Sequence, residues 1–160
     1  MKHSFLISLL VFILSTVFAS SSKAAAIPGS INSKNIVNNN NDTMSNKIRI
    51  KVRSSSFIAT LSDNTTATAF KALLPMTINM TELNGNEKYF NLSSNFFTNA
   101  SNPSTIQTGD LMMYGANTLV LFYKTFSTSY SYTKLGRIEN AKGLAAALGN
   151  GNVTVTFEVQ

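Results

Sequence analysis

Residues 109–138, GDLMMYGANTLVLFYKTFSTSYSYTKLGRI, decide the fold of this chain. Two apolar runs, residues 111–114 and 118–124, flank a Gly-Ala-Asn turn, and this pattern predicts two neighbouring antiparallel strands. A segment rich in Ser, Thr and Tyr follows, and residues 134–138 predict a further short strand. The run LVLFY has no polar interruption, so we expect both faces of its strand to be covered by other parts of the protein.

Strand geometry assigns the side chains of this run to two faces. Successive side chains in a strand point to opposite sides of the sheet. Leu119, Leu121 and Tyr123 should therefore share one face, and Val120 and Phe122 should share the other. We expect most of this run to be core.

Outside this stretch, the sequence predicts more short strands and two short helices. Asn84-Gly85 is the strongest turn signal, because both residues tolerate a positive φ angle. Residues 63–65 should cap the first helix and Pro75 should end it, whereas Asn140 should cap the second. The predicted strands are residues 47–53, 57–61, 76–83, 87–92, 111–114, 118–124, 134–138 and 153–158, and the predicted helices are residues 66–74 and 141–148.

These elements predict a mainly β fold, a closed barrel of seven to eight strands with two short helices capping its open ends. An open α+β sheet fits the same elements less well, because such a sheet would leave strand edges exposed.

The N-terminal part of the chain resembles a targeting segment. Residues 1–26 combine a basic start, an uncharged apolar run and a small-x-small cleavage pattern, which predicts a signal peptide. An uncleaved membrane anchor is the alternative. Residues 27–46 are rich in Asn and Ser and predict a disordered linker, so the folded domain should cover residues 47–160. We expect an exported protein, periplasmic or secreted, whose mature form is not attached to a membrane.

Two residue types that support much of enzyme chemistry are scarce. The chain has no cysteine, and its single histidine, His3, lies in the predicted signal peptide. A mature protein without His and Cys has no Ser-His-Asp or Cys-His relay and no zinc ligands of the imidazole or thiolate type. We therefore expect no catalytic relay, no metal and no cofactor.

The chain carries 13 basic and 7 acidic side chains, and residues 47–53 hold four of the basic ones. Lysines and arginines alternate there with Ile and Val, which predicts one charged and one apolar strand face. A nucleic-acid surface is one interpretation. A solvated outer face that is protected from edge pairing is the favoured one, so we expect no nucleic-acid partner.

Aromatic rings with polar tips gather around and after the second apolar run. Such side chains are common at binding surfaces, because they offer a large contact area at little entropy cost. Glu87 follows the Asn-Gly turn, and Arg137 is the arginine nearest the aromatic residues in the sequence. These two could form an ion pair beside a groove or belong to ordinary surface pairs. The candidate ligand-binding residues are Tyr114, Phe126, Tyr130, Tyr132, Arg137 and Glu87.

Two other features have competing interpretations. Phe96-Phe97 lies in a polar loop, residues 93–108, and should either pin that loop onto the core or form a lid or rim. Asp110 follows Gly109 and is expected to accept a hydrogen bond that closes a turn. A metal-ligand role for Asp110 is less favoured, because no second carboxylate stands at ligand spacing.

The order of the motifs resembles a known family. The chain presents FIATLSDNTTATAFKALLP, LNGNEKY, GDLMMYG, LVLFYKTF, a Ser/Thr/Tyr segment, LGRI and a final VTVTF strand. This order is similar to that of small bacterial cyclophilin-like proteins, over residues 48–157. The resemblance implies a closed β-barrel with capping helices in a divergent, largely uncharacterised group.

The same resemblance raises the question of prolyl isomerase activity. True cyclophilins use an arginine in an Arg-x-Ile-Pro-x-Phe type stretch, a Gln-Gly-Gly-Asp element and a Trp or His. Residues 106–110, IQTGD, echo the second element, whereas the arginine stretch is absent and the predicted mature chain has neither Trp nor His. Rotation about an X-Pro bond needs no nucleophile, only weakened amide resonance, which a guanidinium could promote. Arg137 is the candidate for that role.

Three hypotheses follow. The leading one is a non-catalytic module that binds an extended peptide or a small ligand in the aromatic groove. The second is a peptidyl-prolyl isomerase with a divergent site. The third is a structural or assembly domain tethered by the linker. The sequence leaves the oligomeric state open.

Overall fold

A computed structural model describes residues 45–160. The predicted signal peptide and all but two residues of the predicted linker lie outside the described residues. The described elements, in chain order, are β1 (Lys47–Val52), β2 (Ser55–Leu61), α1 (Thr65–Lys71), β3 (Met76–Leu83), β4 (Glu87–Asn91), β5 (Thr105–Ile106), β6 (Asp110–Tyr114), β7 (Thr118–Phe122), β8 (Phe126–Ser127), β9 (Thr133–Ile138), α2 (Leu144–Leu148) and β10 (Val153–Val159).

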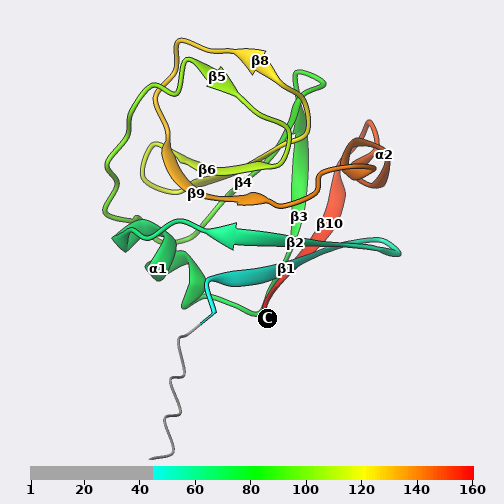
Figure 1. The fold of residues 1–160 in the computed structure, drawn as a ribbon, viewed down its shortest axis with the longest axis horizontal. Helices are drawn as coiled ribbons and strands as arrows, with labels where there is room; N and C mark the ends of the chain where they lie inside the picture. The colour runs from blue at the N-terminus through cyan, green and yellow to red at the C-terminus, as the bar shows by residue number, and fades with distance from the viewer. Residues whose placement is uncertain (1–44) are drawn as a thin grey trace, which may run out of the picture. The chain divides into compact units, whose positions relative to one another are not determined.

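Eight of these strands form a closed antiparallel barrel in the order β1-β10-β3-β4-β7-β6-β9-β2 (Figure 1). The predicted mainly β barrel with two short helices is thus confirmed. Two strands of two residues each, β5 and β8, pair separately from the barrel. The sequence did not predict these two, because a two-residue strand has no measurable period.

The basic strand β1 has the predicted two faces. Ile48, Ile50 and Val52 are fully buried, and the cations alternate with them on the outside. Lys51 forms an ion pair with Glu158. The predicted reason for these charges was wrong, however. β1 pairs with β10 on one side and β2 on the other, so it is not an edge strand that needs protection.

Helix α1 begins as predicted and ends earlier. The side chain of Asn64 accepts a hydrogen bond from the backbone N–H of Ala67 at 2.8 Å, which caps the first turn. Phe70 is fully buried and packs edge-on against Phe157 of β10, with ring centroids 5.8 Å apart. The helix ends at Lys71 instead of the predicted residue 74, and Leu73 beyond its end is exposed.

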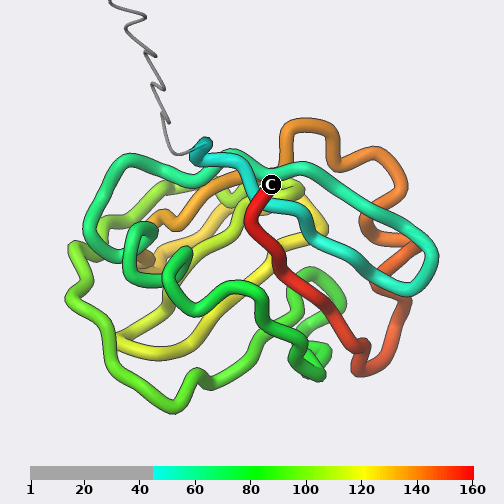
Figure 2. The backbone as a smooth tube through the Cα atoms, turned by 90° about the horizontal axis from the view of Figure 1, so that it is seen from below, coloured from blue at the N-terminus to red at the C-terminus, as the bar shows by residue number. Residues whose placement is uncertain are grey.

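Helix α2 is shorter than predicted, and Asn140 does not cap it. Its first residue is Leu144, and Gly143, with φ of 84°, occupies the N-cap position. The side chain of Asn140 accepts from the backbone N–H of Lys142 instead, so it stabilises the preceding turn. The two helices lie at opposite ends of the barrel (Figures 1 and 2). No helix within residues 45–160 is long and apolar enough to cross a membrane.

The loop before β6 is attached to the core through one ring of its phenylalanine pair. Phe96 packs against the barrel core, whereas Phe97 is 93% exposed. The backbone carbonyl of Phe97 accepts a hydrogen bond from Thr66 of α1. The prediction that paired phenylalanines pin the loop is therefore correct for the first ring only.

Barrel closure requires a close approach at Gly136. This residue of β9 lies opposite Leu61 of β2 and Leu111 of β6, next to a register shift in the β6–β9 pairing. A Cβ atom at position 136 would lie 2.5 Å from the carbonyl oxygen of Thr60 and 3.0 Å from the Cα of Leu61. Glycine is typical of such irregular, tightly approached strand positions.

Replacing this glycine should therefore destabilise the barrel. We expect Gly136→Ala to lower the free energy of unfolding by about 1–3 kcal/mol, because backbone must move to admit the methyl group. Gly151→Ala is the matched control, since a Cβ there meets nothing within 4 Å. Urea unfolding measures both. Equal stabilities of the two variants would contradict this account of barrel closure.

Candidate functional site

The alternation predicted for the LVLFY run is confirmed. Leu119, Leu121 and Tyr123 belong to the core inside the barrel. Val120 and Phe122 are also buried, but they belong to a second apolar cluster on the outer face of the sheet. The outer cluster consists of Ile106, Met112, Val120, Phe122 and Tyr132, with Tyr89 and Phe126 packed against it.

The β5–β8 pair covers part of this outer face. Ile106 of β5 lies opposite Phe126 of β8, and both contact the outer cluster. The ring of Phe122 lies 5.7 Å from that of Phe126 and 5.5 Å from that of Tyr132, between ring centroids. The outer strand face therefore carries its own small hydrophobic core, which fixes the segment between β7 and β9.

A groove of about 390 Å³ opens between this covered region and the β3–β4 hairpin. Strand register explains its lining: Tyr89 lies opposite Val120, and Tyr114 lies opposite Thr118, with all four side chains on the outer face. We call this hollow the aromatic groove. Its rings are Tyr89, Tyr114, Phe126, Tyr130 and Tyr132.

The structure brings five of the six candidate residues to the aromatic groove. Its lining includes Tyr114, Phe126, Tyr130, Tyr132 and Glu87. Tyr132 is 8% exposed, whereas Tyr114 and Tyr130 are 45% and 62% exposed. The buried ring belongs to the outer core, and the two exposed rings stand free at the groove.

Arg137 is the candidate that the structure places elsewhere. Its Nε lies 3.6 Å from Oδ1 of Asp110, its register partner across β9 and β6. Of the two interpretations offered for Glu87 and Arg137, the mutual ion pair is wrong, because strands β6 and β7 separate β9 from β4 in the barrel. Arg137 lines a different hollow, which shares Tyr132 with the aromatic groove.

Asp110 has the turn-closing role that was predicted. Its Oδ2 accepts a hydrogen bond from the backbone N–H of Gln107 at 2.8 Å, and the residue is almost fully buried. Among residues 45–160, no three His, Cys, Asp or Glu side chains come together as a candidate metal site.

Glu87 supplies the charge of the groove. Its carboxylate is half-buried and has no ion-pair or side-chain hydrogen-bond partner within residues 45–160. Burial raises the pKa of Glu87, and the negative charge of Glu82 raises it further. Burial also raises the pKa of Tyr132, and the charge of Glu87 adds to that shift. The negative charge of Glu87 therefore acts on the hydroxyl group of Tyr132.

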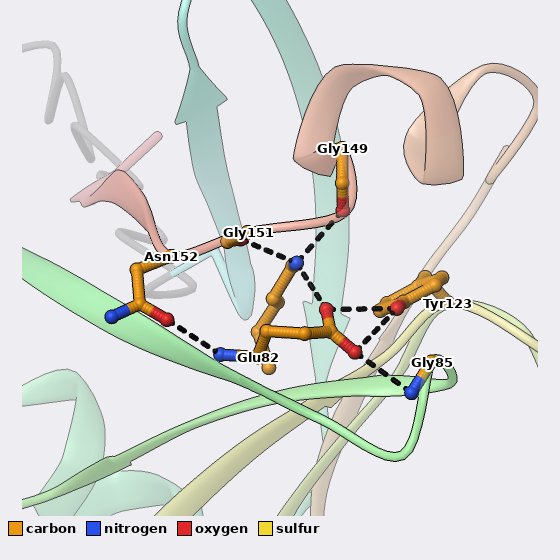
Figure 3. A network of polar contacts seen from close by, with 7 residues as sticks. Glu82, Gly85, Tyr123, Gly149, Gly151 and Asn152 are labelled. Carbon is orange, nitrogen blue, oxygen red and sulfur yellow. Dashed lines mark hydrogen bonds and ion pairs between the residues drawn. The ribbon is translucent and has the colours of Figure 1, made fainter.

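A buried lysine, which sequence reasoning missed, lies on the opposite side of β4. Lys88 is fully buried and points into the barrel, because its neighbour Glu87 points out. Its ammonium group donates to the carbonyl oxygens of Gly149 and Gly151, at 2.8 and 2.7 Å, and to the carboxylate of Glu82. Figure 3 shows these contacts. Each of the three N–H groups of the ammonium thus has a hydrogen-bond acceptor.

The carboxylate of Glu82 is bound on its other sides as well. The hydroxyl of Tyr123 contacts both carboxylate oxygens, at 2.9 and 2.8 Å, and the backbone N–H of Gly85 donates to one of them at 2.8 Å (Figure 3). Burial alone would raise the pKa of Glu82, but the hydrogen bonds from Lys88, Tyr123 and Gly85 bring it below its usual value. Burial, with the hydrogen bond to Glu82, raises the pKa of Tyr123 to about 12.

The sequence contained a signal for this pair. Asn84 and Gly85 have φ of 56° and 68°, the predicted tight turn, and in the resulting register Glu82 lies opposite Lys88. Side chains that are directly opposite in a hairpin share one face. Extending the register from the turn would have identified the pair, although only the fold shows that this face is interior.

Comparisons with known proteins support the fold. The model of the cyclophilin-like family matches residues 50–158. The solution structure of the hypothetical protein AF2241 from Archaeoglobus fulgidus resembles this chain with a TM-score of 0.56 and 19% sequence identity, over 72% of this chain and 95% of that one. At this identity the likeness concerns the fold alone. No curated protein sequence matches the chain.

Removing the buried ammonium should strongly destabilise the protein. We expect Lys88→Met to lower the free energy of unfolding by about 3–5 kcal/mol, because it leaves the Glu82 charge and two carbonyl groups without their partner. Lys51→Met is the control, since it breaks an exposed pair with Glu158 and should cost under about 1 kcal/mol. Thermal unfolding of both variants tests this, and similar losses would contradict the described role of Lys88.

Removing the charge of Glu87, unlike removing that of Lys88, should stabilise the protein. Folding raises the pKa of Glu87 above the ordinary 4.5, so ionisation of Glu87 disfavours the folded state. The resulting loss of stability grows as pH rises through the folded pKa. Glu87→Gln should therefore be more stable than wild type at pH 7, by on the order of 0.5 kcal/mol after solvent screening, and equal to it near about pH 3.5.

Glu139→Gln is the control for this pH dependence. The hydrogen bonds from Lys47 and Thr60 lower the pKa of Glu139, so its ionised form favours folding. That variant should be less stable than wild type at pH 7. Urea unfolding between pH 3.5 and 7 measures both effects, and a loss of stability in Glu87→Gln at pH 7 would contradict the account of Glu87.

Proposed function

The chain belongs to the cyclophilin-like family, and we propose that its barrel is a non-catalytic binding module that takes an extended peptide or a small ligand in the aromatic groove. The observation that carries the proposal is the exposure of large apolar side chains around one hollow. Leu83, Tyr114 and Tyr130 are each at least 40% exposed, and all three line the groove. Apolar surface gathered in this way is typical of ligand sites.

The groove has a floor of buried side chains and walls of solvent-exposed rings. Val120 and Tyr132 are held in the outer core, whereas the rings of Tyr114 and Tyr130 reach solvent. A ligand that covers these two rings removes apolar surface from water without requiring the barrel to rearrange. A fixed floor reduces the ordering entropy that binding must overcome.

The chemistry of the lining favours binding without catalysis. A guanidinium that stabilises a twisted prolyl amide would have to lie beside the bound peptide. Among residues 45–160, no arginine and no lysine lines the groove, and Arg137 faces Asp110 on another strand. The proposal therefore assigns no isomerase role to the groove.

The proposal includes export. The basic start, the apolar run and the small-x-small pattern within residues 1–26 support a signal peptide. The mature protein would then meet its ligand in the periplasm or outside the cell, with the Asn-rich residues 27–46 preceding its folded domain.

Ligand-induced changes in NMR chemical shifts, measured with pools of short peptides and small metabolites, test the binding role. We expect the shifted backbone signals to cluster on β4, β7 and residues 126–132. Tyr130→Ala should weaken the binding of any hit roughly tenfold, about 1.4 kcal/mol, because it removes a free ring of the groove. Phe97→Ala removes an even more exposed ring outside the groove and should leave binding unchanged.

The same preparations discriminate the enzyme hypothesis. Isomerisation of a proline peptide should stay at the uncatalysed rate in the wild type and in Arg137→Ala. Catalysis that disappears in Arg137→Ala would contradict the non-catalytic role. Shifts that cluster away from the groove, or an equal effect of Phe97→Ala, would contradict the assigned binding site.

A further inference from the structure

The aromatic groove has an unusual charge for this protein. The chain carries 13 basic and 7 acidic side chains, yet the part of it that the structure describes contributes one carboxylate, that of Glu87, and no basic side chain to the groove. Two lysines flank this region without entering the groove. Lys88 points into the barrel and binds Glu82, and the Nζ of Lys124 lies beside Gly85 at the hairpin turn.

The carboxylate of Glu87 lacks a compensating charge. A half-buried carboxylate loses part of its hydration, and an opposite charge or hydrogen bonds normally offset that loss. Within residues 45–160 Glu87 has neither. Its neighbour Asn86 also lines the groove, and the buried Oδ1 of Asn86 has no hydrogen-bond partner. Of these two groups, the carboxylate of Glu87 is the one that a bound group could reach, since Oδ1 of Asn86 is buried.

Tyr114 packs against two other tyrosine rings at the groove. The ring of Tyr114 is nearly perpendicular to that of Tyr130, at 87° and 6.1 Å between centroids, and is tilted by 51° from that of Tyr132 at 5.6 Å. The face of an aromatic ring carries negative electrostatic potential. At these distances the three rings form one cluster, and the exposed surfaces of Tyr114 and Tyr130 can contact a group bound beside it.

From these observations we infer that the aromatic groove binds an organic cation, with its alkylammonium group held between the tyrosine rings and the carboxylate of Glu87. The inference rests on the proposed function and names the chemistry of its ligand. Aromatic rings attract an ammonium group within about 6 Å of their centroids, most strongly where water is excluded. The carboxylate of Glu87 adds a direct charge pair at the wall of the groove.

The other ligand classes fit this lining less well. An anion would meet the carboxylate of Glu87 with no basic side chain to offset it. A neutral apolar group, such as a proline ring, would bury that carboxylate further without compensating its charge. A bound cation compensates the charge of the Glu87 carboxylate. The affinity for a cation therefore comes from both the aromatic rings and the charge pair.

A pair of isosteric probes separates charge from shape. Choline carries a trimethylammonium group, and 3,3-dimethylbutan-1-ol has a neutral carbon in place of its nitrogen. NMR titration of the full chain should show choline binding with a dissociation constant on the order of 1 mM and at least tenfold tighter than the alcohol. Peptides with a central lysine, trimethyllysine or norleucine determine whether the cation comes from a small molecule or a side chain.

Four variants connect this preference to the named residues. Glu87→Gln, which keeps the shape of the side chain, should reduce the affinity for choline about tenfold and leave the alcohol unchanged. Tyr130→Leu should weaken choline binding, whereas Tyr130→Phe, which keeps the ring, should retain it. Glu139→Gln removes a carboxylate paired with Lys47 outside the groove and should have no effect.

The outcomes separate this inference from the proposed function. Groove shifts with equal affinities for choline and the alcohol, unchanged in Glu87→Gln, would overturn the cation preference and leave the binding module intact. Binding of the lysine peptides, but not of the norleucine peptide or choline, would support a cationic side chain as the ligand. No groove shifts with any probe, the peptide pools included, would overturn both proposals.

Discussion

The arrangement of this barrel depends on the contacts that the buried ammonium group of Lys88 makes. This group lies fully buried between the carboxylate of Glu82 and the carbonyl oxygens of Gly149 and Gly151. These contacts join the β3–β4 hairpin to the loop between α2 and β10. A buried charge is tolerated only where its hydrogen-bonding capacity is filled, so the loop has little freedom to move away.

This internal contact also determines the outer surface. Neighbouring residues of a strand point to opposite faces, so fixing Lys88 inside the barrel directs Glu87 outward. The hydrogen bond from Gly85 to Glu82 holds the turn that precedes them. The wall of the aromatic groove is therefore supported from within the barrel, while its floor is the outer cluster built on Phe122. A site on the outer face can change its side chains without disturbing the interior.

Much of this structure follows from local sequence patterns. The alternation within LVLFY predicted its two buried faces, the Asn84-Gly85 pair predicted its hairpin, and residues 63–65 predicted the start of α1. The errors about the charged residues and their strands concern non-local information. Arg137 is close to the tyrosines in sequence, but barrel order places it beside Asp110. The burial of Lys88 and the central position of β1 likewise depend on which strands close the barrel, which one strand's periodicity does not encode.

The central claim is that the outer aromatic groove, and no other surface, is where this barrel holds a ligand. Intermolecular nuclear Overhauser effects between the methyl protons of bound choline and the protein test it most directly. The account predicts contacts to the ring protons of Tyr114, Tyr130 and Tyr132. Contacts confined to the hollow beside Arg137, or to any surface away from these rings, would contradict it.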